Sequence, residues 1–116
     1  MGVVRGGAAS SRMRAEPALL WPVPAHWSLE DAATVPLPYT HALYCLAIKT
    51  QMLPRSRVLV SGGAGATGQA VISLALHLDC RVFVVVREMK KKQFLMKMFP
   101  KLYGKHFGFL KAHFIA

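Results

Sequence analysis

Residues Val58 to Leu78 read VLVSGGAGATGQAVISLALHL, and this stretch decides the fold. A short apolar run leads into four clustered glycines, and apolar residues at helical spacing follow them. Residues 63–68 match the pattern G-x-G-x-x-G, which binds the pyrophosphate of a dinucleotide when it joins a strand to a helix. The stretch therefore predicts a strand, a tight turn and a helix whose N-terminus faces a phosphate.

Each glycine of this pattern has a separate predicted role. Gly63 permits the tight turn, Gly65 lets the backbone approach a pyrophosphate, and Gly68 lets the helix pack closely on the strand. The backbone amides of Ala66 and Thr67 are the expected phosphate donors. Two other interpretations stay open: a turn that binds nothing, and a membrane span, which the glycines and polar side chains of the stretch disfavour.

A second strand is predicted directly after this helix. Residues 80–86 read CRVFVVV, a continuous apolar run typical of a strand covered on both faces of a parallel sheet. Asp79 stands before it, where the end of a helix needs a residue in the left-handed conformation. Strand, helix and strand form a βαβ unit. The predicted fold class is α/β, a truncated part of a Rossmann-type nucleotide-binding domain with a doubly wound parallel sheet.

Two further elements follow this unit. A helix is predicted at residues 89–99, ended by Pro100, with Phe94, Leu95 and Met98 toward the sheet. A third strand near residues 106–110 is a weaker prediction, because the aromatic tail has no clear period.

Extended and then helical structure is predicted before the glycine-rich stretch. Ser28 with Asp31 three residues later is typical of a capped helix start, and Pro38 suits the first turn of a second helix that ends near Gln51. One face of that second helix is expected to carry Tyr39, Leu43, Leu46 and Ala47. The chain divides into a poorly defined segment at 1–19, an extended segment with linking helices at 20–53, and an incomplete nucleotide-binding domain at 54–116.

Composition and charge limit the classes of function. The 116-residue chain is 53% hydrophobic, so we expect it to fold, and its net charge is +10. The basic residues are spread along the chain, and only residues 90–92 form a run. No nucleic-acid-binding motif accompanies them, so a basic nucleic-acid-binding module is kept only as an alternative function. The two cysteines and five histidines lack metal-ligand spacing, so no metal site is predicted.

Two blocks of the sequence carry a family resemblance. They are residues 21–54, WPVPAHWSLEDAATVPLPYTHALYCLAIKTQMLP, and residues 57–86, RVLVSGGAGATGQAVISLALHLDCRVFVVV. Together they resemble the medium-chain dehydrogenase/reductase superfamily, and within it most closely the enoyl reductase domain of animal fatty acid synthase. The narrower resemblance rests on Trp-Ser-Leu-Glu-x-Ala-Ala at 27–33 and on Gly-Gln-Ala at 68–70.

The resemblance implies an enzyme larger than this chain. A GroES-like barrel would precede it and the rest of a Rossmann domain would follow, in a cytoplasmic, homodimeric, zinc-independent parent. That parent would use NADPH to reduce the 2,3-double bond of an enoyl thioester linked to an acyl carrier protein. The chain is expected to be a truncated or alternatively spliced fragment. Family proton donors fall outside the matched residues, so the catalytic residues are unknown.

Two members of the same superfamily stay open as alternatives. One is a quinone oxidoreductase-like enzyme, and the other is a mitochondrial enoyl reductase, which the Arg-rich start at residues 1–20 keeps open. The sequence also departs from the family pattern: Arg55 and Asp79 stand where glycines are usual.

The resemblance adds Thr40 and Lys91 as candidate cofactor-binding residues, and Arg87, which departs from the family pattern, is added because of its charge. Thr40 matches a family position near the bound cofactor, and Lys91 matches a family lysine. Arg87 and Lys91 follow the second strand, where cations attract the 2′-phosphate of NADPH. Glu88 lies 20 residues after Gly68, the spacing of the acid that holds the ribose in NAD enzymes. NADPH is the favoured cofactor, with NADH as the alternative.

Overall fold

The computed structural model describes residues 1–102 and 106–109. The chain forms two compact units, Met1–Leu37 and Pro38–Ala116. The first unit contains the short 3-10 helix η1 (Pro17–Leu19) and helix α1 (Leu29–Ala33). No helix in the described ranges combines the length and apolarity that a membrane crossing needs.

The first unit begins as a loop closed by backbone hydrogen bonds. The Met1 ammonium donates to the Trp21 carbonyl at 2.7 Å, and the Trp21 amide donates to the Met1 carbonyl at 2.8 Å. The predicted helix start at Ser28 is confirmed. The Ser28 hydroxyl oxygen accepts the Asp31 amide at 3.0 Å, which satisfies one of the free donors in the first turn of α1.

The second predicted helix starts earlier and ends differently. Helix α2 (Pro36–Leu43) continues into a π-helical segment, η2 (Tyr44–Lys49). The Thr50 amide and hydroxyl both donate to the Cys45 carbonyl, a five-residue step that fixes the wider turn. The single apolar face predicted for this helix is wrong. Leu46 is buried in the core, but Leu43 is 51% exposed, and its neighbour Ala42 is buried in its place.

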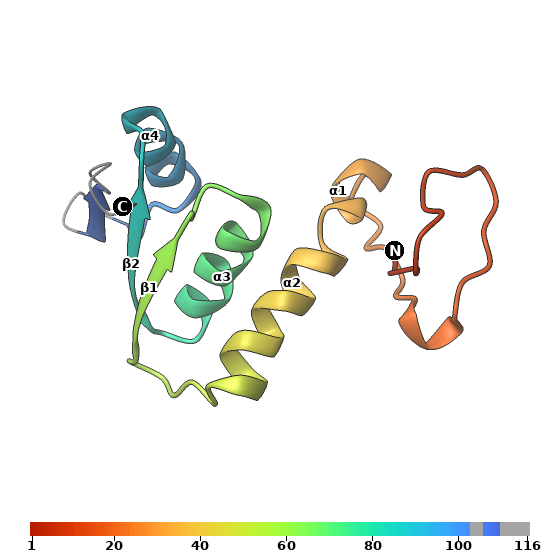
Figure 1. Cartoon of the computed structure of the whole chain (residues 1–116), viewed down its shortest axis with the longest axis horizontal. Helices are drawn as coiled ribbons and strands as arrows, with labels where there is room; N and C mark the ends of the chain where they lie inside the picture. The colour runs from red at the N-terminus through yellow and green to blue at the C-terminus, as the bar shows by residue number, and fades with distance from the viewer. Residues whose placement is uncertain (103–105, 110–116) are drawn as a thin grey trace, which may run out of the picture. The chain divides into compact units, whose positions relative to one another are not determined.

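The predicted strand, glycine turn, helix and strand are confirmed, and so is the α/β fold class. Figure 1 shows helix α3 lying along strands β1 and β2. The strand order is β1-β2-β3, and both strand pairs are parallel. The weakly predicted third strand is therefore present. The elements are β1 (Arg57–Ser61), α3 (Ala66–His77), β2 (Arg81–Val86), α4 (Met89–Met98) and β3 (Phe107–Phe109).

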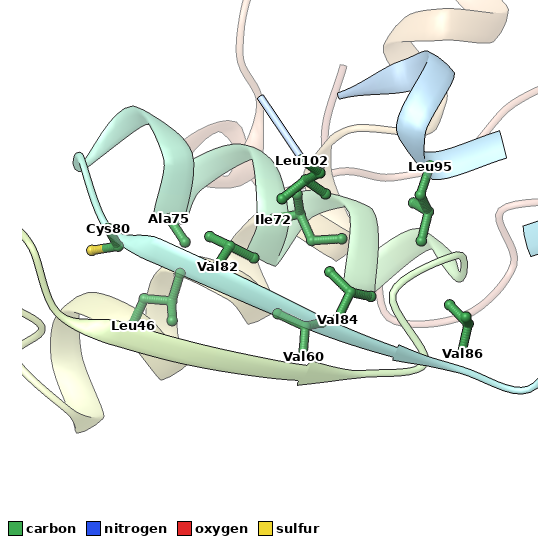
Figure 2. Close-up of a cluster of buried hydrophobic side chains, with 10 residues drawn as sticks. All are labelled: Leu46, Val60, Ile72, Ala75, Cys80, Val82, Val84, Val86, Leu95 and Leu102. Carbon is green, nitrogen blue, oxygen red and sulfur yellow. The ribbon is translucent and has the colours of Figure 1, made fainter. Parts of the chain in front are cut away.

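One face of the sheet carries the core. Val82, Val84 and Val86 of β2 alternate along the strand and are all buried. Figure 2 shows these side chains together with Ile72 of α3 and Leu95 of α4. Burial of such aliphatic side chains stabilises the fold by about 1.5–3 kcal/mol each. The same cluster also contains Leu46, Val60, Ala75, Cys80 and Leu102.

The other face of the sheet is only partly covered within the described residues. Phe83 and Val85 of β2 are half-buried, and Leu59 of β1 is 71% exposed. The prediction that β2 is covered on both faces is therefore wrong here, since α3 and α4 pack on the same side. Phe94 and Met98 of α4 were also expected toward the sheet, but they are 44% and 53% exposed.

The turn before β2 has the predicted conformation. Asp79 has a φ of 57°, in the left-handed region. Arg55, in the turn before β1, also has a positive φ of 66°. The Arg55 amide donates to the Asp79 carbonyl at 3.1 Å, so the two turns are joined directly.

Candidate functional site

The carboxyl ends of β1 and β2 open into a hollow. Parallel strands all end at one edge of the sheet, where open α/β folds bind their ligands. The hollow has a volume of about 380 Å³. Its lining combines the glycine turn, the last residues of β2 and two cationic side chains: Ser61, Gly62, Gly63, Ala64, Gly65, Val85, Val86, Arg87 and Lys91.

The tight turn after β1 is made by Gly62. Its φ of 70° lies in the left-handed region, and its amide donates to the Val85 carbonyl at 3.3 Å. The assignment of the tight turn to Gly63 is therefore wrong by one residue. Serine, two glycines and alanine succeed one another here, and the G-x-G-x-x-G match alone does not identify which glycine takes the positive φ.

Gly63 and Gly68 instead allow close packing. A Cβ at Gly63 would overlap the Val84 side chain, and Gly63 is buried against the sheet. A Cβ at Gly68 would lie 2.5 Å from the Gly62 carbonyl oxygen and 2.7 Å from the Gly63 Cα. The turn and the first turn of α3 therefore approach backbone to backbone, as predicted for Gly68.

The glycine turn is hydrogen-bonded to the start of α3. The Gly65 amide donates to the Gly62 carbonyl at 3.0 Å, and Gly65 is the N-cap of the helix. The Gln69 side chain donates to the Ala64 carbonyl at 2.8 Å. The amides in the first turn of α3 have no acceptor within the helix, and this turn contains no acid. Free amides and a positive dipole end together suit an anion.

The end of β2 adds positive charge to the same hollow. Arg87 and Lys91 both line it, and both are exposed. Glu88, the N-cap of α4, accepts a hydrogen bond from the Lys91 ammonium at 2.5 Å. The local charge of Arg87, Glu88 and Lys91 is thus +1, with Arg87 making no ion pair to a described carboxylate.

The hollow brings together some of the predicted residues and not others. Gly63, Gly65, Arg87 and Lys91 line it. Gly68, Ala66 and Thr67 lie in the first turn of α3 and are not in its lining. Thr40 lies exposed on α2, also outside the lining.

Sequence reasoning missed Ser61, Gly62, Ala64, Val85 and Val86 in the lining. The common feature of most of these residues is their place at the carboxyl end of a strand or directly after it. That rule, applied to both predicted strands, would have found them.

Metal binding finds no support in the same region. Across residues 1–102 and 106–109, no three His, Cys, Asp or Glu side chains lie close enough to hold a metal ion. The hollow offers a ligand two cationic side chains, which bind phosphate groups, and it adjoins the free amides in the first turn of α3.

The chain is similar to parts of several known proteins. No protein-family model matches the chain. It is 35% identical over 92 residues, 79% of its length, to the reducing polyketide synthase rads1 of Floropilus chiversii. The chain spans only 4% of that synthase.

Two solved structures share the fold. The quinone oxidoreductase of Thermus thermophilus, whose structure includes a complex with NADPH, matches with 30% identity and a TM-score of 0.72. That match covers 78% of this chain and 30% of the oxidoreductase. The CurK enoyl reductase matches with 32% identity and a TM-score of 0.62, over 66% of this chain and 23% of the reductase.

Proposed function

Because the matched part of this chain belongs to the medium-chain dehydrogenase/reductase superfamily, we propose that its glycine-turn hollow binds NADPH. The carrying observation is that the hollow combines the glycine turn with Arg87 and Lys91. The free amides of α3 bind the pyrophosphate, and the two cations bind the 2′-phosphate. The NADPH complex of the Thermus oxidoreductase supports this choice of cofactor.

We further propose that the parent of this chain is an enoyl thioester reductase. NADPH supplies a hydride to the β-carbon of the 2,3-double bond, and a proton is added at the α-carbon. The negative charge that develops on the thioester oxygen requires stabilising donors. This chain contributes binding and orientation of the cofactor, and no residue of it is assigned a catalytic role. The substrate is an acyl thioester carried by a carrier protein.

The kind of synthase is a finer part of this proposal. The sequence resemblance favours a fatty acid synthase, whereas the curated relatives are reducing polyketide synthases. The reaction proposed for this chain's parent is the same for both kinds of synthase. The coding sequence that flanks this reading frame shows whether the chain is part of a synthase or of a separate small gene. Upstream acyltransferase or dehydratase coding and downstream ketoreductase coding support a synthase.

A quinone oxidoreductase is the second candidate function. The observation that favours it is the match to the Thermus quinone oxidoreductase, which covers 78% of this chain at 30% identity. The cofactor site is expected to be the same in both enzymes, since the hollow binds only the phosphate groups of NADPH. The difference lies in the substrate cleft, which the described residues do not include.

A chimera tests the cofactor site that the two candidates share. In it, this chain replaces the segment of the CurK enoyl reductase that it matches. We expect NADPH to bind and an enoyl thioester such as crotonyl pantetheine to be reduced. The same chimera made with a Gly65→Val segment keeps the surrounding enzyme but fills the turn, and we expect it to lose activity. Failure to bind any nicotinamide cofactor in a folded chimera would contradict both.

A further inference from the structure

A second hollow lies at the opposite edge of the sheet from the glycine turn. It is formed where β1 and β2 begin, and its volume is about 470 Å³. Because parallel strands start at one edge and end at the other, this hollow is separate from the cofactor site. Its lining consists of Arg55, Arg57, Asp79, Cys80 and Arg81.

Three arginines line this hollow, one from β1, one from β2 and one from the turn before β1. Arg57 and Arg81 are register partners in the parallel pair of β1 and β2, so their side chains leave the same face side by side. Arg55 joins them from the turn before β1. With Asp79 the hollow carries a net charge of +2. None of the three arginines contacts a carboxylate of the described residues at ion-pair distance.

The backbone that holds these side chains is fixed. The Arg55 amide donates to the Asp79 carbonyl at 3.1 Å, and the Arg81 amide donates to the Ser56 carbonyl at 2.8 Å. The Cys80 thiol is buried beneath and donates to the Leu53 carbonyl. The backbone at the arginines is therefore preorganised, and a ligand does not have to order the turns.

The two turns also carry unusual residues. Arg55 has a φ of 66° and Asp79 a φ of 57°, conformations that glycine adopts without cost. This chain thus places a cation in a strained turn beside two other cations. A positive φ is strained for a residue with a Cβ, so glycine at either position is expected to relieve its turn.

We propose that this hollow binds a small polyvalent phosphate anion of the pyrophosphate class. Arginine forks match phosphate oxygens in a bidentate manner, and three arginines that line one hollow suit two linked phosphate groups. The site takes no part in binding the nicotinamide cofactor, so this proposal is tested independently of the proposed function.

Inorganic pyrophosphate is the probe, and calorimetric titration is the measurement. The full 116-residue chain is held in solution as a fusion to a carrier protein, and the carrier alone is the blank. Arg55→Gly removes one cation and relieves its turn, so we expect it to fold at least as well and to bind pyrophosphate about tenfold more weakly. Asp79→Gly relieves its turn in the same way but removes the opposing charge. We expect it to bind about threefold more tightly.

Two further variants control for charge and for the other hollow. Arg14→Gly removes the same charge outside the hollow, and Arg87→Ala alters only the cofactor site. We expect both to leave the Arg55-dependent part of the affinity unchanged. Equal affinities for the parent chain, Arg55→Gly and Asp79→Gly would overturn the proposal. So would a loss on Arg55→Gly that Arg14→Gly reproduces. A preference for a DNA oligonucleotide over pyrophosphate at physiological salt would also contradict it.

Discussion

At the scale of single residues, cofactor choice depends on how three neighbouring charges are paired. The sequence offers two ways to bind the ribose of the cofactor. Glu88 would hold the ribose hydroxyl groups of NADH, and Arg87 with Lys91 would hold the 2′-phosphate of NADPH. In the structure the Lys91 ammonium is 2.5 Å from the Glu88 carboxylate, so part of the positive charge is already neutralised. This pairing could not be predicted, since spacing alone does not fix which acid a flexible lysine meets.

Glu88→Gln should therefore strengthen the preference for NADPH. The change frees Lys91 for the 2′-phosphate and removes a repelling carboxylate. Because the pair is half-exposed, we expect an increase of only about threefold in NADPH affinity, with NADH affinity unchanged or lower. Fluorescence titration of both cofactors with the chimera measures this. A rise in NADH affinity would assign a different role to the carboxylate.

Two glycines have separate roles: Gly65 in cofactor binding and Gly68 in packing. At Gly65, φ is −75° and an added Cβ would meet only the Gly62 carbonyl oxygen, at 3.5 Å. Gly65→Ala should change the free energy of unfolding by less than about 0.5 kcal/mol, yet weaken cofactor binding about tenfold or more. Gly68→Ala forces backbone apart and should lose about 2–3 kcal/mol of stability. Thermal denaturation of the two chimeras compares them, and equal losses would contradict these separate roles.

At the scale of elements, the βαβ unit was predictable, whereas the helix before it was predicted without its π-helical second half. Strand β1, the glycine turn, α3 and β2 each have a local pattern that agrees with the final packing. Helix α2 and segment η2 do not. Their outcome depends on the five-residue hydrogen bonds around Thr50, and apolar spacing does not reveal these.

The candidate site follows the same rule. Gly63, Gly65, Arg87 and Lys91 could be found because each follows a predicted strand. Gly62 was missed as the turn residue because its role depends on which carbonyl its amide meets. The missing catalytic residues are a different case, since no pattern in the matched residues points to a proton donor.

The glycine turn depends on α3 through Gln69. Its side-chain amide donates to the Ala64 carbonyl at 2.8 Å and is partly buried. Gln69→Ala should cost about 1 kcal/mol and lower NADPH affinity about fivefold, because the turn loses its tether. Gln93→Ala, which changes an exposed glutamine on α4, is the matched control and should alter neither quantity. If both variants bind NADPH like the parent, the tether has no part in binding.

At the scale of the whole molecule, the sheet leaves apolar surface open. Leu59 is 71% exposed on the face that also carries half-buried Phe83 and Val85, and β1 is an edge strand of the described sheet. Exposed apolar faces and open edges promote association. We expect the purified chain to self-associate and to show no reduction of an enoyl thioester with NADPH above a blank. A monodisperse preparation with turnover would contradict this expectation.

Leu59→Thr tests the cause of that association. It places a β-branched residue in the strand but removes apolar surface, so we expect less aggregate by light scattering. Leu53 is equally exposed, at 71%, but lies outside the sheet, and Leu53→Thr is the control. If both changes reduce aggregation equally, the open sheet face is not its source.

The central claim is that the hollow at the carboxyl edge binds NADPH through Arg87 and Lys91. The most direct measurement is the ratio of NADH to NADPH dissociation constants for the chimera, before and after changing both residues to alanine. We predict a ratio above one that falls close to one in the double variant, because the charge-assisted contacts to the 2′-phosphate are lost. A ratio that the double variant leaves unchanged would contradict the claim and would assign recognition of the ribose to Glu88.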